Sequence, residues 1–201
     1  MTTALLVIDV QESFRRQPIW SLTSNPDIVG AVNRLVEHAR ANGQPVIWVL
    51  HTAPGTGGVF DPALGHVRPM AGLAPAAGEP VITKTSHNAF TTTNLQQLLT
   101  ERGVRKLIIS GIRTEQCCET TARVGSDLGY RITFVTEATT TNPIAHRDAP
   151  EDLTPEELLA DPRTLRTEDI LARTEFMLAG RFATIRTVDE VTGAPALETV
   201  G

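Results

Sequence analysis

Runs of hydrophobic residues with two different spacings alternate along the chain. Continuous apolar runs, typical of strands that are buried on both faces, occupy residues 4–8, 45–50, 81–84, 107–109, 132–135 and 182–185. Apolar residues at helical spacing, together with capping and stop signals, predict helices over residues 25–43, 93–102, 115–128 and 167–180. Because strands alternate with helices, we expect an α/β fold whose parallel sheet is covered on both faces.

Two segments interrupt this alternation. Residues 51–79 are rich in Gly and Pro and show weak periodicity, which predicts a long functional loop. Residues 143–167 contain four prolines and several acids, and a capping box formed by Thr154 and Glu157 predicts a short helix among them. This proline-rich, acidic insertion is a candidate lid, subunit-contacting arm or inert surface excursion. A length of 201 residues suits one domain, so we assign residues 1–201 to a single domain that includes the insertion.

The net charge and the cysteines limit which partners and which cellular compartment we expect for this protein. With 18 Lys and Arg against 23 Asp and Glu, the net charge is −5, which is not the electrostatic footprint of a protein that binds nucleic acid or anionic membrane. No apolar run approaches the roughly 20 residues that span a bilayer, and no basic leader precedes the first strand. The two cysteines are adjacent, so a disulfide between them would be strained and free thiols are expected. We therefore predict a cytoplasmic protein that binds neither nucleic acid nor membrane.

Three residues with possible chemical roles follow predicted strands. Asp9 ends the first strand, Lys84 ends the third, and Cys117 lies in the first turn of the helix after the fourth. Ligands of parallel sheets bind at the carboxyl ends of the strands, so we expect the three side chains to lie together. Thr114 stands at the expected N-cap, which makes Cys117 the third helical residue, where the helix terminus favours a thiolate. Asp9 can take the thiol proton, and Lys84 can keep Asp9 ionised and lower the pKa of the thiol.

Each of these residues also has an ordinary structural interpretation. An Asp at the end of a strand is usually a loop or capping residue, and a Lys in that position is usually a solvated charge. A Cys in the first turn of a helix is most often a small buried hydrophobe. Only the combination of the three, at one expected edge of the sheet, indicates chemistry.

Three motifs containing these residues stand in order along the chain. They are Asp9-Val10-Gln11 with Phe14, then Lys84 with Ala89-Phe90, then Gly111-Ile112-Arg113-Thr114 with Cys117, Thr121-Ala122-Arg123 and Gly129-Tyr130. Together they resemble motifs of the isochorismatase-like cysteine hydrolase superfamily. Three separated motifs in the right order are a more specific signal than one short match. The resemblance covers about residues 4–140, and residues 182–183 and 187–191 also fit it.

The resemblance implies a Rossmann-like three-layer α/β/α sandwich with a six-stranded, mostly parallel sheet. It implies a catalytic triad of Asp9, Lys84 and Cys117, with an oxyanion hole made by the backbone amides of Arg113 and Cys117. It further implies a cis peptide bond between Ile112 and Arg113. Cys118 stands where the family usually has valine, so we expect its side chain to face the core.

Departures from the family pattern narrow the expected activity. Relatives of the nicotinamidase type carry an Asp-x-His…His metal site after the second strand, whereas here His51 is followed by no neighbouring acid. His51, His66 and His87 lack ligand spacing, so we predict no metal and no cofactor. True isochorismatases lack the cysteine and use the aspartate alone on a vinyl ether. Retention of Cys117 therefore favours hydrolysis of an amide C–N bond, through a thioester, in a small-molecule substrate.

Two alternative functions remain at this stage. One is isochorismatase-type ether hydrolysis, which needs Asp9 and not Cys117. The other is a non-catalytic thiol redox sensor, suggested by the adjacent cysteines. The family resemblance also implies a homodimer or larger homo-oligomer, and for this reason we favour a subunit-contacting arm for residues 143–167.

Candidate substrate-binding residues lie on the loops expected around the crevice. They are Phe14, Trp20, Phe60, His87, Phe90 and Arg113, with His51 and Asn142 as further candidates. The histidines are equally well explained as hydrogen-bonded surface residues. Arg113 can pair with a substrate carboxylate or pack outward, and the sequence does not choose between the two.

Overall fold

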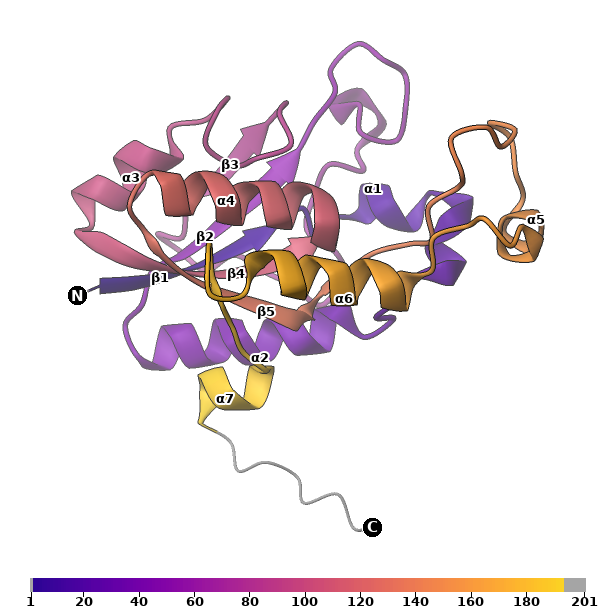
Figure 1. Cartoon of the computed structure of the whole chain (residues 1–201). Coiled ribbons are helices and arrows are strands. Elements are labelled where there is room, and N and C mark those ends of the chain that lie inside the picture. The colour runs from indigo at the N-terminus through magenta and orange to yellow at the C-terminus, as the bar shows by residue number, and fades with distance from the viewer. Residues whose placement is uncertain (1, 194–201) are drawn as a thin grey trace.

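Six parallel strands form one sheet in the computed structural model, which describes residues 2–193 (Figure 1). The strands are β1 (Thr2–Ile8), β2 (Val46–His51), β3 (Val81–Lys84), β4 (Val104–Ile112), β5 (Arg131–Thr140) and β6 (Thr184–Ile185). Their order across the sheet is β3-β2-β1-β4-β5-β6, and every neighbouring pair is parallel. The predicted α/β fold with six parallel strands is confirmed.

Helices cover both faces of this sheet. They are α1 (Glu12–Arg15), α2 (Ile28–Ala41), α3 (Leu95–Glu101), α4 (Glu119–Asp127), α5 (Pro155–Ala160), α6 (Thr167–Leu178) and α7 (Val188–Thr192), with short turns η1 (Pro18–Leu22), η2 (Pro62–Leu64) and η3 (Thr114–Cys118). In Figure 1, α2 and α7 lie on one face and α4 and α6 on the other. Among residues 2–193, no helix is long and apolar enough to cross a membrane.

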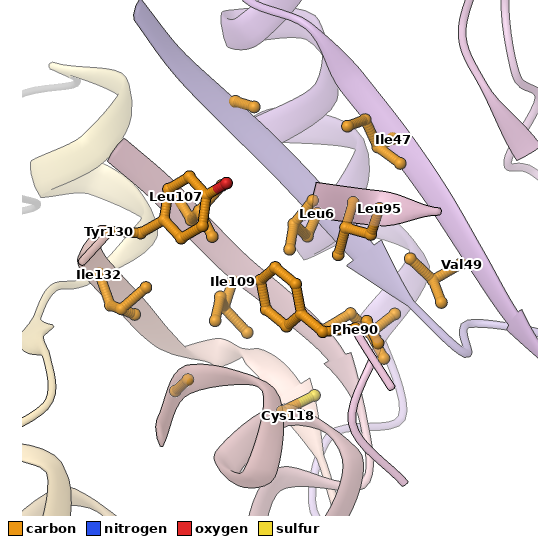
Figure 2. Packing of buried hydrophobic residues seen from close by; sticks show 14 of the residues in the cluster. Leu6, Ile47, Val49, Phe90, Leu95, Leu107, Ile109, Cys118, Tyr130 and Ile132 are labelled. Carbon is orange, nitrogen blue, oxygen red and sulfur yellow. The ribbon is translucent and has the colours of Figure 1, made fainter. Parts of the chain in front are cut away.

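The continuous apolar runs of the central strands reflect burial on both faces. Because side chains alternate along a strand, Leu6 and Ile8 of β1 join a cluster beneath α3 and α4, whereas Leu5 and Val7 join a cluster beneath α2. Figure 2 shows the first cluster, in which Leu6 lies among side chains from several elements. The two clusters hold the carboxyl ends of β1 and β4 in fixed positions.

Some boundaries differ from the sequence prediction for local reasons. The helix predicted from residue 25 begins at Ile28, because Asp27 caps it by accepting from the Gly30 amide, while the Asn25 side chain donates to the Glu137 carbonyl. The predicted last strand shortens to Thr184–Ile185. The strands β4 and β5 run beyond their apolar cores, since polar residues at their ends still pair with neighbouring strands. The helices α1 and α7 are too short to produce a periodic signal.

Gly111 is required where β4 passes closest to β1. Its φ is +138°, and a Cβ at this position would lie 1.9 Å from the carbonyl oxygen of Ile8. We expect Gly111→Ala to lower the free energy of unfolding by about 3 kcal/mol, through backbone displacement and an unfavourable φ. Urea unfolding followed by circular dichroism measures this. The control is Gly58→Ala, whose new Cβ meets no atom closer than 3.6 Å, and an equal effect of both substitutions would contradict the explanation.

The insertion, residues 143–167, is closed at its base and carries the predicted short helix. Ile144 and Leu165 exchange backbone hydrogen bonds of 3.0 and 2.9 Å in an isolated antiparallel bridge. The capping box of Thr154 and Glu157 is present at the start of α5, as predicted. The helix α5 contacts η1, and Figure 1 shows the insertion projecting beyond the end of the sheet. Its role as a subunit-contacting arm stays a prediction.

Candidate active site

Asp9, Lys84 and Cys117 meet at the carboxyl edge of the sheet. The Nζ of Lys84 lies 2.7 Å from Oδ2 of Asp9 and 3.4 Å from Sγ of Cys117. The side chains of Asp9 and Lys84 are fully buried, and Cys117 is 7% exposed. The structure thus brings together the three residues that the sequence places after separate strands, and it puts a carboxylate, an ammonium group and a thiol in one contact cluster.

Gln11 fixes the turn that carries Asp9. The Asp9 backbone has a φ of +58°, and its amide donates to the carbonyl of Val49 over 2.7 Å. Two residues later, the Gln11 side chain accepts from the His51 amide (2.7 Å) and donates to the His51 carbonyl (3.0 Å). The Gln11 side chain, two residues after Asp9, therefore joins the end of β1 to the end of β2, while Asp9 faces the cluster.

Hydrogen bonds also hold the loop that follows β3 next to Cys117. Besides Asp9 and Cys117, Lys84 Nζ contacts the Ser86 carbonyl at 3.1 Å, so three acceptors surround the ammonium group. The Thr121 hydroxyl donates to the Cys117 carbonyl (2.6 Å) and accepts from the Ala89 amide (3.0 Å). Thr121 therefore links the loop after Lys84 directly to the turn that holds Cys117.

The helix that carries Cys117 starts with a wide turn, which corrects one prediction. Arg113, not Thr114, is the N-cap residue, and Thr114 is the first residue of the π-helical turn η3. The Cys118 amide donates to the Arg113 carbonyl over 3.1 Å. The Thr114 hydroxyl donates to Thr139 on β5 (2.8 Å) and does not cap the helix. The predicted cis peptide bond between Ile112 and Arg113 is confirmed.

The two cysteines have different surroundings, as expected. Cys118 is completely buried, and Figure 2 shows its sulfur in the cluster that also contains Phe90 and Ile109. Cys117 reaches the pocket described below. Adjacent helical residues point in directions about 100° apart, which separates the two thiols.

Burial dominates the ionisation of this cluster. It raises the pKa of Asp9 to about 6, although Lys84 favours the charged carboxylate. Burial and the Asp9 carboxylate raise the pKa of Cys117 to about 12, against the opposing effect of Lys84. Burial opposes the charge of Lys84, but attraction by Asp9 and Cys117 outweighs it and the pKa of Lys84 is raised. The expected lowering of the thiol pKa is therefore wrong for the resting protein, which at neutral pH holds a carboxylate, an ammonium group and a thiol.

A pocket of about 230 Å³ opens onto the cluster. Its lining residues are Asp9, Phe14, Gln17, His51, Phe60, His87, Arg113, Gln116 and Cys117. The Phe60 ring packs edge-on against Phe14 (5.0 Å between centroids) and His51 (5.3 Å). Burial, followed by the charge of Lys84, lowers the pKa of His51 to about 4, so this histidine is neutral at pH 7. Drug-sized ligands occupy pockets of about 300–1,000 Å³, so this one suits a smaller molecule.

The pocket contains some of the candidate substrate-binding residues and not others. Phe14, Phe60, His87 and Arg113 line it, as does His51.

Three other candidates lie outside the pocket. Trp20 packs against the hydrophobic cluster beneath α2. Phe90 stacks on Tyr130 in the core, with ring centroids 5.9 Å apart. Asn142 is buried and donates to the Ile19 carbonyl over 2.8 Å. Their positions on loops near the expected crevice, or in a motif for Phe90, do not show whether each side chain faces the pocket or the core.

Sequence reasoning missed two lining residues, Gln17 and Gln116. Gln116 directly precedes Cys117, so its position in the sequence was a usable signal. Gln17 lies between α1 and η1, two short elements that no periodicity predicts. Only the folded chain brings it to the pocket.

The residues around the pocket do not fit the metal site of nicotinamidase-type relatives. Within residues 2–193, no three His, Cys, Asp or Glu side chains gather as ligands of a metal ion would. His51 lies in the pocket wall, but the residue two positions before it is Val49, where that site has an acid. Asp9 is already paired with Lys84.

Comparisons with known proteins identify the family. A model of the isochorismatase domain matches residues 3–155. The uncharacterised isochorismatase family protein YddQ of Bacillus subtilis is 32% identical over 149 residues, which cover 74% of this chain and 83% of YddQ. Nicotinamidase 3 of Arabidopsis thaliana is 31% identical over 151 residues, which cover 69% and 73% of the two chains. The crystal structure of an isochorismatase from Pseudomonas putida superposes with a TM-score of 0.80 at 31% identity, over 94% of this chain and 89% of that one. The chain belongs to the isochorismatase family of hydrolases.

Proposed function

We propose that this protein is a cysteine-dependent hydrolase that cleaves an amide C–N bond of a small molecule through a thioester acyl-enzyme. The observation that carries the proposal is the contact of Asp9, Lys84 and Cys117 at a pocket large enough only for a small substrate. The similarity to a nicotinamidase supports amide chemistry. In this proposal Cys117 is the nucleophile, Asp9 the general base and acid, and Lys84 the group that balances their charge.

The first half of the cycle forms the thioester. Asp9 accepts the proton of the Cys117 thiol as the sulfur attacks the amide carbon, and the carbonyl oxygen becomes an oxyanion. We assign the backbone amides of Arg113 and Cys117 to the stabilisation of this oxyanion. The tetrahedral intermediate then collapses, the C–N bond breaks, and the proton on Asp9 passes to the leaving nitrogen.

The second half releases the acid. Asp9, again ionised, accepts a proton from water while the hydroxide attacks the thioester carbon. The C–S bond breaks, and the thiolate recovers its proton from Asp9. A carboxyl group with a pKa of about 6 suits both roles, since general acid–base catalysis is most efficient when the pKa is near the working pH.

The two alternatives receive less support from the site. Ether hydrolysis by Asp9 alone gives no role to the thiol that Lys84 contacts. Redox-sensing cysteines are exposed and have a low pKa, whereas Cys118 is completely buried and the pKa of Cys117 is raised to about 12.

The direct test is a panel of small primary amides incubated with the purified protein. We expect ammonia release from at least one of them, and an acid-quenched sample should carry an acyl group whose mass maps to Cys117. Ammonia release without any cysteine adduct under single-turnover conditions, or cleavage confined to vinyl ethers, would count against the proposal.

The pH dependence of the reaction follows from Asp9. Because the base must be ionised, we expect kcat/KM to rise about tenfold per pH unit below pH 6 and to level off above it. The thiol does not limit this rise, since its proton is transferred to Asp9 during the reaction. Steady-state kinetics from pH 4.5 to 8.5, with circular dichroism confirming folding at each pH, provide the measurement. A rate that is flat or falls through this range would rule out Asp9 as the base.

A further inference from the structure

Arg113 places a positive charge in the wall of the pocket without an acidic partner. Its side chain is half-buried, and its guanidinium carbon lies 6.0 Å from the centroid of the Phe14 ring. Nη2 donates to Oε1 of Gln17 over 3.1 Å. Among residues 2–193, no carboxylate oxygen lies within 4.0 Å of this guanidinium. Of its five N–H donors, most are therefore available to a ligand.

No neighbouring acid forms an ion pair with this guanidinium among residues 2–193. The acid in the cluster, Asp9, is already paired with Lys84. Glu115 attracts Arg113 from a distance, but its carboxylate oxygens lie more than 4.0 Å from the guanidinium, and its Oε2 accepts a 2.6 Å hydrogen bond from the Thr141 hydroxyl. His51, on the pocket wall, is neutral at pH 7. The pocket therefore has one unpaired cation beside a compensated pair.

We infer that the substrate carries a carboxylate that binds Arg113, in addition to the amide that Cys117 attacks. This inference rests on the proposed function and names the class of its substrate. A partly buried cation is costly unless an anion joins it, and the planar guanidinium fork matches a carboxylate with two parallel hydrogen bonds.

The size of the pocket limits what can lie between the two groups. Arg113 and Cys117 line the same cavity of about 230 Å³, so the carboxylate and the amide must be separated by a short chain. Monoamides of short dicarboxylic acids have this form. The Phe14 ring and the Gln17 amide oxygen, which both contact the guanidinium, act as positioning residues for it.

The test compares two substrates that share the same amide and differ in charge, succinamic acid and its methyl ester. The malonic and glutaric homologues are included to cover the spacing. We expect the wild-type protein to prefer the acid in kcat/KM, and Arg113→Met to reduce this preference about 10- to 100-fold, the range of a charge-assisted hydrogen bond.

Two further variants separate charge recognition from a structural role. Gln17→Glu keeps Arg113 in place but supplies an internal carboxylate, so it too should reduce the preference for the acid. Arg16→Met removes an exposed positive charge outside the pocket and should leave the preference unchanged. Equal turnover of acid and ester by the wild-type protein, or an equal loss for both in Gln17→Glu, would overturn the inference.

A binding measurement distinguishes failure of this inference from failure of the proposed function. Succinate and glutarate are titrated calorimetrically into the wild-type protein and into Arg113→Met. Binding that is weakened at least about tenfold in the variant supports carboxylate recognition, even if no amide in the panel is hydrolysed. Binding that is absent from the wild-type protein or unchanged in the variant, with no preference for the acid in turnover, overturns it.

Discussion

Cys117→Ala is expected to lower the rate of amide hydrolysis by at least about a thousandfold, because the proposed thioester cannot form without the sulfur. The loss should appear in kcat, since the substitution removes the attacking atom and leaves the pocket walls in place. The measurement is ammonia release under saturating amide, with the most active substrate from the panel. Turnover at the wild-type rate would refute the cysteine mechanism and return the ether-hydrolase alternative to first place.

The adjacent cysteine supplies a matched control. Cys118→Ala removes the same atom from the neighbouring residue, but that sulfur lies in the core and not at the pocket. We expect turnover within a few-fold of wild type and a decrease of about 1 kcal/mol in the free energy of unfolding. If both variants lost activity equally, the loss would reflect damage to the helix start and not removal of a nucleophile.

Lys84→Met is expected to lower the free energy of unfolding by about 3–5 kcal/mol at pH 8. The substitution keeps the approximate length of the side chain but leaves the Asp9 carboxylate buried without its counter-ion. Apart from Lys84, neither carboxylate oxygen has a donor in hydrogen-bonding geometry among residues 2–193, and Lys84 is the largest of the groups that favour the charged carboxylate. Urea unfolding at several pH values measures the effect, and a change below about 1 kcal/mol at pH 8 would show that the ion pair is not coupled to stability.

The pH dependence of this variant has a definite sign. The pKa of Asp9 is about 6 in the folded protein and 3.8 as its ordinary value, so protonation favours folding. The stabilisation from that proton is fully present below pH 3.8 and is lost as the pH rises through 6. Without the ammonium group of Lys84, the Asp9 carboxyl group of Lys84→Met protonates more readily still. The loss of unfolding free energy in this variant should therefore become smaller as the pH is lowered from 8 to 5. The double variant Asp9→Asn/Lys84→Met should recover most of the lost stability at pH 8 and remain inactive.

The sequence predicts the meeting of Asp9, Lys84 and Cys117 because topology alone brings them together. Each residue follows a predicted strand, and the strands of a parallel sheet end at the same edge. The order of the apolar runs was sufficient for this argument, even though the ends of several strands were placed wrongly. The resemblance to a known family added the cis peptide bond at Arg113 and the choice between the two cysteines.

Ionisation and pocket lining could not be predicted in the same way. The pKa of Cys117 depends on the balance between burial, Asp9 and Lys84. The sequence predicts that a helix begins near Cys117, but it does not give the size of these competing effects. Phe90 belongs to a motif and Trp20 lies shortly after one, yet their rings pack outside the pocket. Gln17 reaches Arg113 from a segment with no regular pattern. Side-chain direction in irregular segments is set by tertiary packing, which local spacing does not encode.

The floor and the walls of the pocket come from different parts of the chain. Asp9 and Lys84 stand at the ends of β1 and β3, whereas Phe60 and His87 lie on the loops before and after β3. The loop between β2 and β3 is anchored in the core by Met70 and Leu73, which lie outside the pocket lining. Changes at pocket-facing loop positions can therefore alter which substrate fits while leaving the residues of the proposed proton transfer in place. For protein engineering, this separation makes the pocket-facing part of the loop between β2 and β3 the natural place for randomisation, with Met70, Leu73 and the strand ends that carry the proposed reaction centre left constant.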